Sequence, residues 1–501
     1  MKRFLCLLLI LATLVSFGGC AAEFNMKCRI GQFPATLDPQ MASSEIELTI
    51  AQNTFEGLMR LDQNNSPVVG CAESYTVSSD GKQYTFKLRK NLKWSNGEKL
   101  DANDFHFGIT RAIDPATGAP FGYLLASVSS VSVTNSDTLV ISLSEKDDNL
   151  LYALTHPVAA PCNKKYFTEC KGKYGITAKT IIGNGTYKTA YMLDKTTIRI
   201  SKNANYTGKF KTRCNSVEFD FKPMNDIEYH DSISNNTWNV TFIDQNTDIS
   251  KIKPGNFNTV KSYTSAYYLV LNSKSTGCRS LNIRKALMLS AGDFSSGELI
   301  KMSEWLPQDI TVCGTPLSDL SGINKHLQIT DFSTAKNLVF NHSSSAILDA
   351  LQNTPFYCAD SGDINSIAKS FAANWQKELG IYMNIETLSD DKLNSKILSG
   401  NFNLAIIKIE SKDRSARSLY NSIYNLLGKP SGLSQINAEL FGSNSTSASV
   451  SAINSYNALI GEQFLVMPIA MAPATYIYTK DFSNVSVNSN GAIDFSFISK
   501  K

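Results

Sequence analysis

Three stretches in the first half of the chain alternate polar and apolar side chains with a period of two. One covers residues 75–88 and turns at Asp80-Gly81, another covers residues 131–143, and the last turns at Asp194-Lys195. Alternation on both sides of short polar turns is typical of β-hairpins. We therefore predict three hairpins, the first with a primed turn, in a strand-rich region that ends near residue 262.

After Tyr267 the apolar side chains recur every three or four positions, which is the period of a helix with one buried face. Asn282 and Asp363 precede two such segments and are predicted as N-caps, and Gly380 is predicted to end the second. A strand, a helix and a strand are predicted to follow over residues 381–385, 389–399 and 402–409. This alternation predicts a sheet covered by helices on both faces, so the fold class is α/β with a mixed α+β first half.

The N-terminus combines a basic start with an apolar run. Lys2 and Arg3 precede an uncharged stretch over residues 4–17, which is shorter than the roughly 20 residues that span a bilayer as a permanent helix. We therefore predict that residues 1–19 are an export signal. Phe17-Gly18-Gly19-Cys20 resembles a bacterial lipobox, with Phe17 in place of the usual leucine, and this implies lipidation of Cys20. Ordinary signal cleavage after Ala22 is the alternative.

Composition narrows the possible functions. At roughly 150 residues per domain, 501 residues predict about three domains, and 43% hydrophobic residues supply their cores. A net charge of only +4 gives no indication of a nucleic-acid partner, and five histidines without metal-ligand spacing indicate no metal or other cofactor. The chain has no nucleophile elbow, phosphate-binding loop or dinucleotide fingerprint. We therefore predict that the protein is not an enzyme.

Eight cysteines follow Cys20, and no two of them form a C-x-x-C pair. An even number of cysteines in an exported protein permits disulfides. Buried free thiols are an equal alternative in a chain of this length, because it does not need cross-links to be stable. No pairing is predicted.

Motifs near the N-terminus follow one another in the order and spacing of a known family. They are Leu37-Asp38-Pro39, Asn53-Thr54-Phe55-Glu56-Gly57-Leu58, and residues 72–75, 79–89, 92–100, 102–105 and 111–115. The chain thereby resembles the dipeptide/oligopeptide family of extracytoplasmic solute-binding proteins of ABC transporters. The resemblance is strong to residue 115 and loose after residue 300. Thr186 and Thr207 replace a proline and a tryptophan of the family pattern.

The resemblance implies a periplasmic-binding-protein-like fold of two lobes joined by a hinge, with three domains. Domain I comprises residues 20–62, 178–262 and 474–501, domain II is a strand-rich insertion over residues 63–177, and domain III is an α/β lobe over residues 263–473. Two chain crossings between the lobes act as the hinge, and ligand is expected to close the lobes around itself. Trp94 and Asp80-Gly81 match family motifs, and we assign them to folding.

The resemblance also implies a ligand site in the cleft between the lobes. In the family a carboxylate soon after the strand that matches residues 401–405, which includes Asn403, holds the free amino end of a peptide. Here Lys412 occupies the expected position, with Glu410 and Asp413 on either side. A one-residue shift would restore the anchor through Asp413. The alternative is that the anchor is absent and the ligand is not a peptide.

Five more residues are candidates for the cleft, and they follow the first family motif or lie at the second crossing: Ser43, Ser44, Glu45, Tyr267 and Tyr268. For Glu45 the alternative is an ordinary surface position on a helix. Tyr267 and Tyr268 point to opposite faces if their segment is extended, so one of the two is expected in the core.

The function predicted from these patterns is that of a substrate-binding lipoprotein of an ABC importer, which captures peptides and delivers them to a permease in the membrane. The alternatives are a binding protein of the same fold for a non-peptide solute, or a sensory receptor. We expect a monomer on the outer face of the bacterial cell membrane, either lipid-anchored or in the periplasm, with no nucleic-acid partner.

Overall fold

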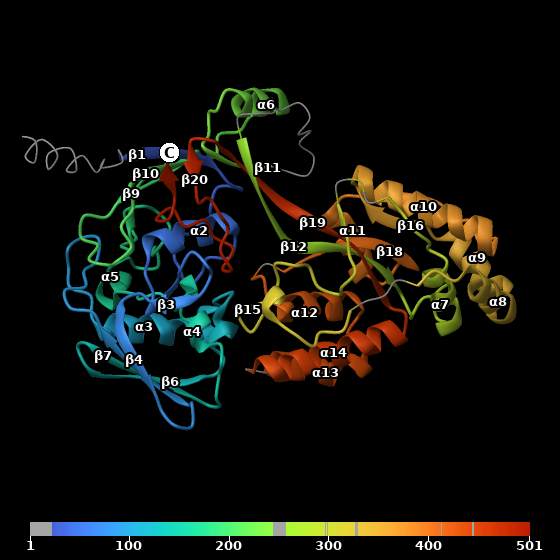
Figure 1. The fold of residues 1–501 in the computed structure, drawn as a ribbon, viewed down its shortest axis with the longest axis horizontal. Coiled ribbons are helices and arrows are strands. Elements are labelled where there is room, and N and C mark those ends of the chain that lie inside the picture. Colours follow the sequence, from blue (N-terminus) through green and yellow to red (C-terminus); the bar gives the residue numbers. More distant parts are fainter. Residues whose placement is uncertain are drawn as a thin grey trace, which may run out of the picture.

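The computed structural model describes residues 23–243, 257–295, 297, 299–325, 329–411, 413–442 and 445–501, and it shows two lobes side by side (Figure 1). The first lobe is drawn in blue to green with the red C-terminal tail, and the second in yellow to orange. The predicted signal, the lipidation site Cys20 and Lys412 lie outside the described residues.

One mixed sheet of eleven strands runs through both lobes. Its order is β17-β16-β18-β12-β19-β11-β1-β10-β9-β8, with β13 beside β19. Two long antiparallel strands at its middle, β12 (Phe257–Leu271) and β19 (Val466–Thr479), extend from one lobe into the other. The two predicted crossings are therefore neighbours in a single sheet.

The first lobe carries one half of this sheet, and a separate four-stranded antiparallel sheet of order β4-β5-β7-β6 packs below it. The strands of the first lobe are β1 (Phe24–Arg29), β2 (Met59–Leu61), β3 (Pro67–Val69), β4 (Ala72–Val77), β5 (Gln83–Leu88), β6 (Val128–Asn135), β7 (Thr138–Leu143), β8 (Tyr187–Leu193), β9 (Thr197–Lys202), β10 (Cys214–Asp220), β11 (Val240–Ile243), β20 (Phe482–Ser483) and β21 (Ser499–Lys500). Its helices are α2 (Glu45–Thr54), α3 (Ala102–Ile113), α4 (Leu150–Ala153), α5 (Lys164–Glu169) and α6 (Asp226–Ser234), with 3-10 turns η1 (Pro115–Thr117), η2 (Gly122–Leu125) and η3 (Pro157–Ala159).

The second lobe covers the other half of the sheet with helices, and its strand β16 is parallel to both β17 and β18. Its strands are β13 (Ile300–Lys301), β14 (Thr311–Val312), β15 (Thr315–Pro316), β16 (Phe356–Ala359), β17 (Ile385–Leu388) and β18 (Leu404–Glu410). Its helices are α7 (Leu281–Leu289), α8 (Phe332–His342), α9 (Ser345–Asn353), α10 (Gly362–Leu379), α11 (Asp390–Leu398), α12 (Ala416–Leu426), α13 (Ser431–Gly442) and α14 (Thr446–Glu462), with the 3-10 turn η5 (Leu317–Asp319).

Buried apolar side chains form two large clusters that correspond to the lobes. One cluster draws only on residues 263–472, and the other combines residues 24–240 with residues 476–498 of the C-terminal tail. The chain therefore leaves the first lobe and returns to it. Residues of the proposed domains I and II share one cluster, and the three-domain division stays a prediction.

The mixed α/β class and the three hairpins are confirmed, but their turns differ from one another. The turn at Asp194-Lys195 has positive φ at both residues, as a primed two-residue turn requires. In the first hairpin only Gly81 has positive φ, and the loop between β4 and β5 is longer than two residues, so the predicted primed turn there is wrong. The physical reason is that Asp80 bonds within the loop, where its carboxylate accepts from the Lys82 N–H at 3.0 Å.

Three predicted boundaries in the second lobe are corrected. The N-caps of α7 and α10 are Ser280 and Ser361 rather than Asn282 and Asp363, so both polar residues lie inside the first helical turn. The strand predicted over residues 381–385 begins only at Ile385. Gly380, with a φ of 68°, ends α10, and the Ile381 N–H bonds back to the Trp375 carbonyl at 3.2 Å, which holds the next residues against the helix end.

Candidate functional site

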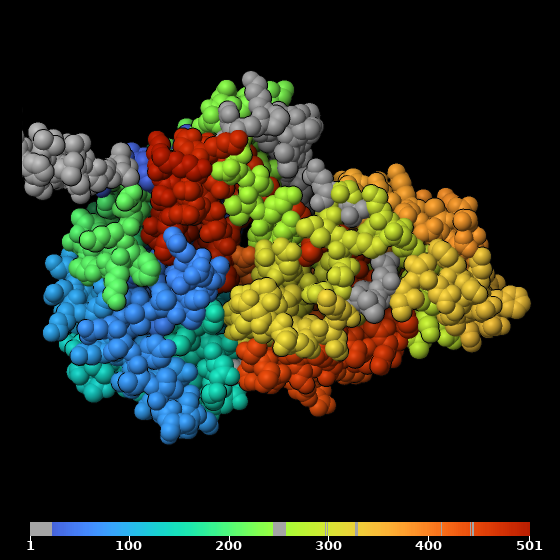
Figure 2. Space-filling model, in the orientation of Figure 1, coloured from blue at the N-terminus to red at the C-terminus, as the bar shows by residue number. Residues whose placement is uncertain are grey.

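The lobes meet beside the crossing strands and enclose a cleft there. Figure 2 shows the blue and cyan surface of the first lobe directly against the yellow and orange surface of the second. Two adjoining hollows of about 480 and 310 Å³ share Glu45, Thr264, Glu410 and Ala474 as lining residues. We call these two hollows together the interlobe cleft.

The crossing strands are irregular where they pass the cleft. The pairing of β12 with β19 shifts register between Ser262 and Ser265, and again between Tyr267 and Tyr268. Opposite the first shift lies Pro473, which has no N–H to give to the ladder and which lines the cleft. The hydrogen-bond ladder between the two crossing strands is therefore interrupted beside the cleft.

Glu45 reaches the cleft from the first residue of α2. The side chains and backbone just before it hold the helix start, because the Glu47 carboxylate accepts hydrogen bonds from the N–H groups of Ser43 and Ser44, each at 2.9 Å. Ser44 is the N-cap in a capping box with Glu47. Ser43 and Ser44 line the smaller hollow, and the capping box fixes the direction of Glu45.

Glu45 is partly buried, and its Oε1 atom is shielded from solvent without a hydrogen-bond partner among the described residues. Burial and the negative charge of Glu410 raise the pKa of Glu45 to about 8, against the opposing effect of the Arg414 guanidinium. Glu410 is the exposed last residue of β18 in the second lobe. The structure thus brings two of the predicted carboxylates together from opposite lobes.

Arg414 bonds across the same junction. Its guanidinium donates to the Ser262 hydroxyl on the first crossing at 2.7 Å and to the Asn488 carbonyl on the C-terminal tail, and it lies 3.7 Å from the Asp309 carboxylate. Burial lowers the pKa of Arg414, while Asp309 and Glu45 favour its charged form. Sequence reasoning did not single out this residue.

The two tyrosines have different surroundings. Tyr267 lines the larger hollow, and burial together with the nearby charge of Asp390 raises its pKa to about 12. Tyr268 lies in the core of the second lobe, where its hydroxyl donates to the Trp305 carbonyl at 2.9 Å. Both tyrosines nevertheless belong to the buried cluster of the second lobe, and Tyr267 is only 2% exposed, so the pair does not divide into one core residue and one free residue.

Asn403 and Asp413 are not among the residues that line the interlobe cleft. Asn403 lies at the far end of β18 from Glu410, roughly 23 Å away at 3.3 Å per residue, and its amide donates to the Ala350 carbonyl. Asp413 is partly buried, and its carboxylate accepts hydrogen bonds from Ser411 and Ser415 at the start of α12. Burial raises the pKa of Asp413.

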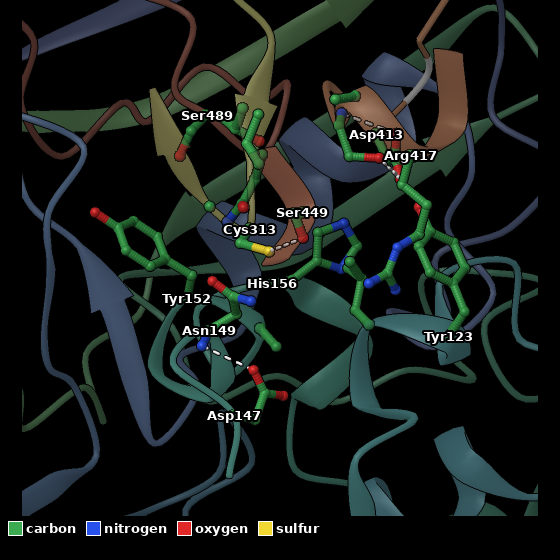
Figure 3. A pocket seen from close by; sticks show the side chains of 18 of the residues that line it. Tyr123, Asp147, Asn149, Tyr152, His156, Cys313, Asp413, Arg417, Ser449 and Ser489 are labelled. Atoms are coloured by element: carbon green, nitrogen blue, oxygen red, sulfur yellow. Dashed lines mark hydrogen bonds between the residues drawn. The ribbon is translucent and has the colours of Figure 1, made fainter. Parts of the chain in front are cut away.

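Asp413 instead lines a third cavity of about 100 Å³, farther along the contact between the lobes (Figure 3). His156 and Arg417 line it as well, and neither was predicted as a site residue. No local motif marks them, because the cavity forms only when residues of both lobes and of the C-terminal tail meet.

The described residues also bear on metals, disulfides and membranes. No group of three or more His, Cys, Asp or Glu side chains among them is arranged to hold a metal ion. All eight cysteines after Cys20 are free thiols, and six of them are buried. Within the same residues no helix is both long enough and apolar enough to cross a bilayer.

Solved structures share this arrangement of two lobes joined by a mixed sheet with two adjacent crossings. The substrate-binding protein CtaP of Listeria monocytogenes, a solved ABC transporter component, has this fold, with a TM-score of 0.76 at 16% identity over 96% of this chain and 99% of that one. The likeness confirms the predicted periplasmic-binding-protein-like fold.

Sequence comparisons relate part of the chain to one family. Residues 66–291 match the family described as bacterial extracellular solute-binding proteins, family 5 Middle. The dipeptide-binding protein of Lactococcus lactis subsp. cremoris is 30% identical over 226 residues, and the oligopeptide-binding protein OppA of Bacillus subtilis is 23% identical over 407 residues. The matched part spans 41% of this chain and 41% of the lactococcal protein, and 76% of this chain and 74% of the Bacillus protein.

Residues 66–291 thus resemble the family 5 extracellular solute-binding proteins, which is the resemblance that the motifs predicted. The relatives are named as binding proteins, in agreement with the prediction that this chain is a binding protein rather than an enzyme.

Proposed function

We propose that the protein captures short peptides with a free amino end in the interlobe cleft and delivers them to the permease of an ABC importer. The match of residues 66–291 to a family of solute-binding proteins supports a role in solute uptake, and the relatives named for dipeptides and oligopeptides support a peptide as the solute. The protein acts outside the cytoplasmic membrane as a monomer. The three-domain division given above is part of the same proposal.

One observation carries the proposal: Glu45 and Glu410 approach the same cleft from different lobes. In the empty cleft the charge of Glu410 disfavours ionisation of Glu45. An ammonium group between the two carboxylates would favour both charges and would bond to both lobes at once. A ligand that contacts both lobes stabilises the closed arrangement over the open one, which is how it would close the cleft.

We assign the amino-end anchor to Glu45 and Glu410 rather than to Asp413. The Asp413 carboxylate already accepts hydrogen bonds from Ser411 and Ser415, so an incoming ammonium would have to displace them. Tyr267 forms part of the wall of the same cleft, but it is only 2% exposed, so it shapes the wall rather than offering its ring to the peptide.

The test compares the peptide Ala-Ala-Ala with its N-acetylated form by calorimetry. We expect the free peptide to bind about 10- to 100-fold more tightly, as a charge-assisted hydrogen bond implies, and Glu410→Gln to remove most of that difference. Glu386→Gln, which changes an exposed carboxylate on β17 outside the cleft, is the matched control and leaves both affinities unchanged. Equal binding of the two peptides by the unchanged protein would exclude the amino-end anchor.

We also propose that Cys20 is lipidated, on the strength of the lipobox-like residues Phe17-Gly18-Gly19-Cys20. In cells that produce the full chain, Cys20→Ala is expected to move the protein from the membrane fraction to the soluble fraction, whereas Cys170→Ala leaves it membrane-bound. An intact mass of the native protein that fits cleavage after Ala22 without a lipid would contradict this assignment.

A further inference from the structure

The third cavity lies between the lobes and is built from three separate parts of the chain. The first lobe contributes residues around η2, α4 and η3, the second contributes the β14–β15 turn and the start of α12, and the C-terminal tail contributes Ser489 and Asn490. Its volume of about 100 Å³ exceeds the roughly 10–15 Å³ that one water needs, so it has room for a group of several atoms.

His156 presents an unused hydrogen-bond donor to this cavity. The residue is 5% exposed, its ring packs against Phe121, and Nδ1 accepts the N–H of Val158 at 3.1 Å. Burial lowers the pKa of His156 to about 3, so the ring is neutral, and because Nδ1 accepts, the proton is on Nε2. Nε2 is buried without a partner among the described residues, and Figure 3 shows the ring standing among the side chains that line the cavity.

A buried donor without an acceptor is unfavourable and is rare in folded proteins. The partner of the His156 Nε2–H group would therefore be an acceptor atom that enters the cavity from outside the chain.

The charges around the cavity indicate what kind of acceptor fits. Asp147 and Asp413 both line the cavity beside Arg417, and burial raises the pKa of each carboxyl group, so a further anionic group is disfavoured there. The Asp147 carboxylate accepts from the Ser127 hydroxyl and the Asn149 N–H, as Asp413 accepts from its neighbouring serines. The rest of the lining is largely apolar and includes Leu124, Val312 and Leu440.

The cavity and the interlobe cleft share their walls. Glu410 and Arg414 line the cleft, while Asp413 and Arg417 of the same short segment line the cavity. The C-terminal tail also contributes to both walls: Val487 and Gly491 line the cleft, and Ser489 and Asn490 line the cavity. A peptide anchored at Glu410 therefore has a side-chain position next to the cavity.

We propose that this cavity is a specificity pocket for one uncharged side chain of the ligand, a phenol or a carboxamide. In this pocket the Nε2–H group of His156 donates a hydrogen bond to the oxygen of that side chain. The inference rests on the proposed function, because it takes the peptide to lie in the interlobe cleft. It adds a substrate class: peptides with tyrosine, glutamine or asparagine at the position that faces the pocket.

The test uses near-isosteric pairs of peptides in calorimetry: Ala-Tyr-Ala with Ala-Phe-Ala, Ala-Gln-Ala with Ala-Met-Ala, and the same pairs with the variable residue third. We expect the polar member of at least one pair to bind about tenfold more tightly. His156→Asn should abolish this preference, because the Asn oxygen can still accept the Val158 N–H while no donor reaches the cavity. Binding of Ala-Ala-Ala should change less than about twofold.

Two further variants complete the test. His156→Gln places an amide donor near the position of Nε2 and should keep part of the preference, which also covers the case in which His156→Asn does not fold. His342→Asn changes an exposed histidine at the end of α8 and should change nothing.

Each outcome of these binding experiments either supports or overturns the proposed specificity pocket. The absence of a preference in every pair, a preference that survives His156→Asn, or tighter binding of Ala-Glu-Ala than of Ala-Gln-Ala would overturn the pocket. If Ala-Ala-Ala binds but no pair is discriminated, only the pocket fails. If no peptide binds at all, the proposed function fails and the pocket fails with it.

Discussion

Carboxylates in this protein have two roles that depend on what surrounds them. Glu56 is buried and paired, with its oxygens 2.7 Å from Arg89 and 3.5 Å from Arg60, and it also accepts from the Tyr206 hydroxyl. The Oε1 atom of Glu45 is shielded and has no such partner among the residues that the structure describes. Pairing makes the first carboxylate part of the fold, and its absence leaves the second available to a ligand.

The unpaired state of Glu45 predicts that binding releases a proton. With a pKa of about 8, Glu45 is mostly protonated at pH 7, and an ammonium group next to it lowers the pKa so that the proton leaves. Affinity for Ala-Ala-Ala should therefore rise from pH 6 to pH 7.5. Calorimetry in buffers of different ionisation enthalpy should give a release approaching about one proton at pH 7.

Glu45→Gln should remove this proton release, and Glu386→Gln should keep it. Proton uptake, or the same release from Glu45→Gln, would contradict the assignment of the raised pKa to the amino-end anchor.

The paired carboxylates predict a large loss of stability when their partner is removed. Arg60 lies 2.5 Å from the Asp494 carboxylate of the C-terminal tail and also faces Glu56, with all three side chains nearly inaccessible to solvent. Arg60→Met would leave two buried carboxylates without this cation and should lower the free energy of unfolding by about 3–5 kcal/mol in urea titrations. Lys87→Met removes an exposed pair with Glu73 and should cost less than about 1 kcal/mol. Similar losses for the two variants would contradict this account.

Among the elements, close packing of α3 restricts one glycine. A Cβ on Gly108 would lie 2.3 Å from the Ala160 carbonyl oxygen and 3.0 Å from the Cys162 nitrogen, both of which are backbone atoms. Gly362 at the start of α10 is in open space. The same substitution should therefore have different effects at the two positions.

Gly108→Ala should lower the melting temperature, with a loss of about 1–3 kcal/mol from the forced backbone shift. Gly362→Ala should be neutral or stabilise by up to about 1 kcal/mol, because alanine favours the helix. Thermal unfolding followed by circular dichroism measures both, and equal melting temperatures would show that the backbone beside α3 can move at no cost.

Local chemistry explains which elements could be predicted. The hairpins and α11 depend on residues close in sequence, and they were found within a few residues of their bounds. The starts of α7 and α10 were misplaced because serine, asparagine and aspartate all serve as N-caps, and the choice between neighbours depends on tertiary packing. Glu45, Tyr267 and Glu410 came from the family resemblance. His156 and Arg414 could not be found, because the residues that line the cavity with His156 and the partners of Arg414 are distant in sequence.

For the whole molecule, a single sheet joins the lobes, so any closing motion must pass through β12 and β19. The register shifts near Ser262 and the proline at 473 reduce the number of ladder bonds that such a motion would strain. The interlobe cleft, which Glu45 and Glu410 both line, lies next to this point, so the closure proposed above would take place beside both carboxylates.

Small-angle scattering with and without Ala-Ala-Ala, beside its acetylated form, tests the central claim that both lobes hold one cationic ligand. The account predicts a smaller radius of gyration with the free peptide, and no change with the acetylated peptide at the same concentration. A radius that stays constant while calorimetry shows the free peptide bound would contradict it.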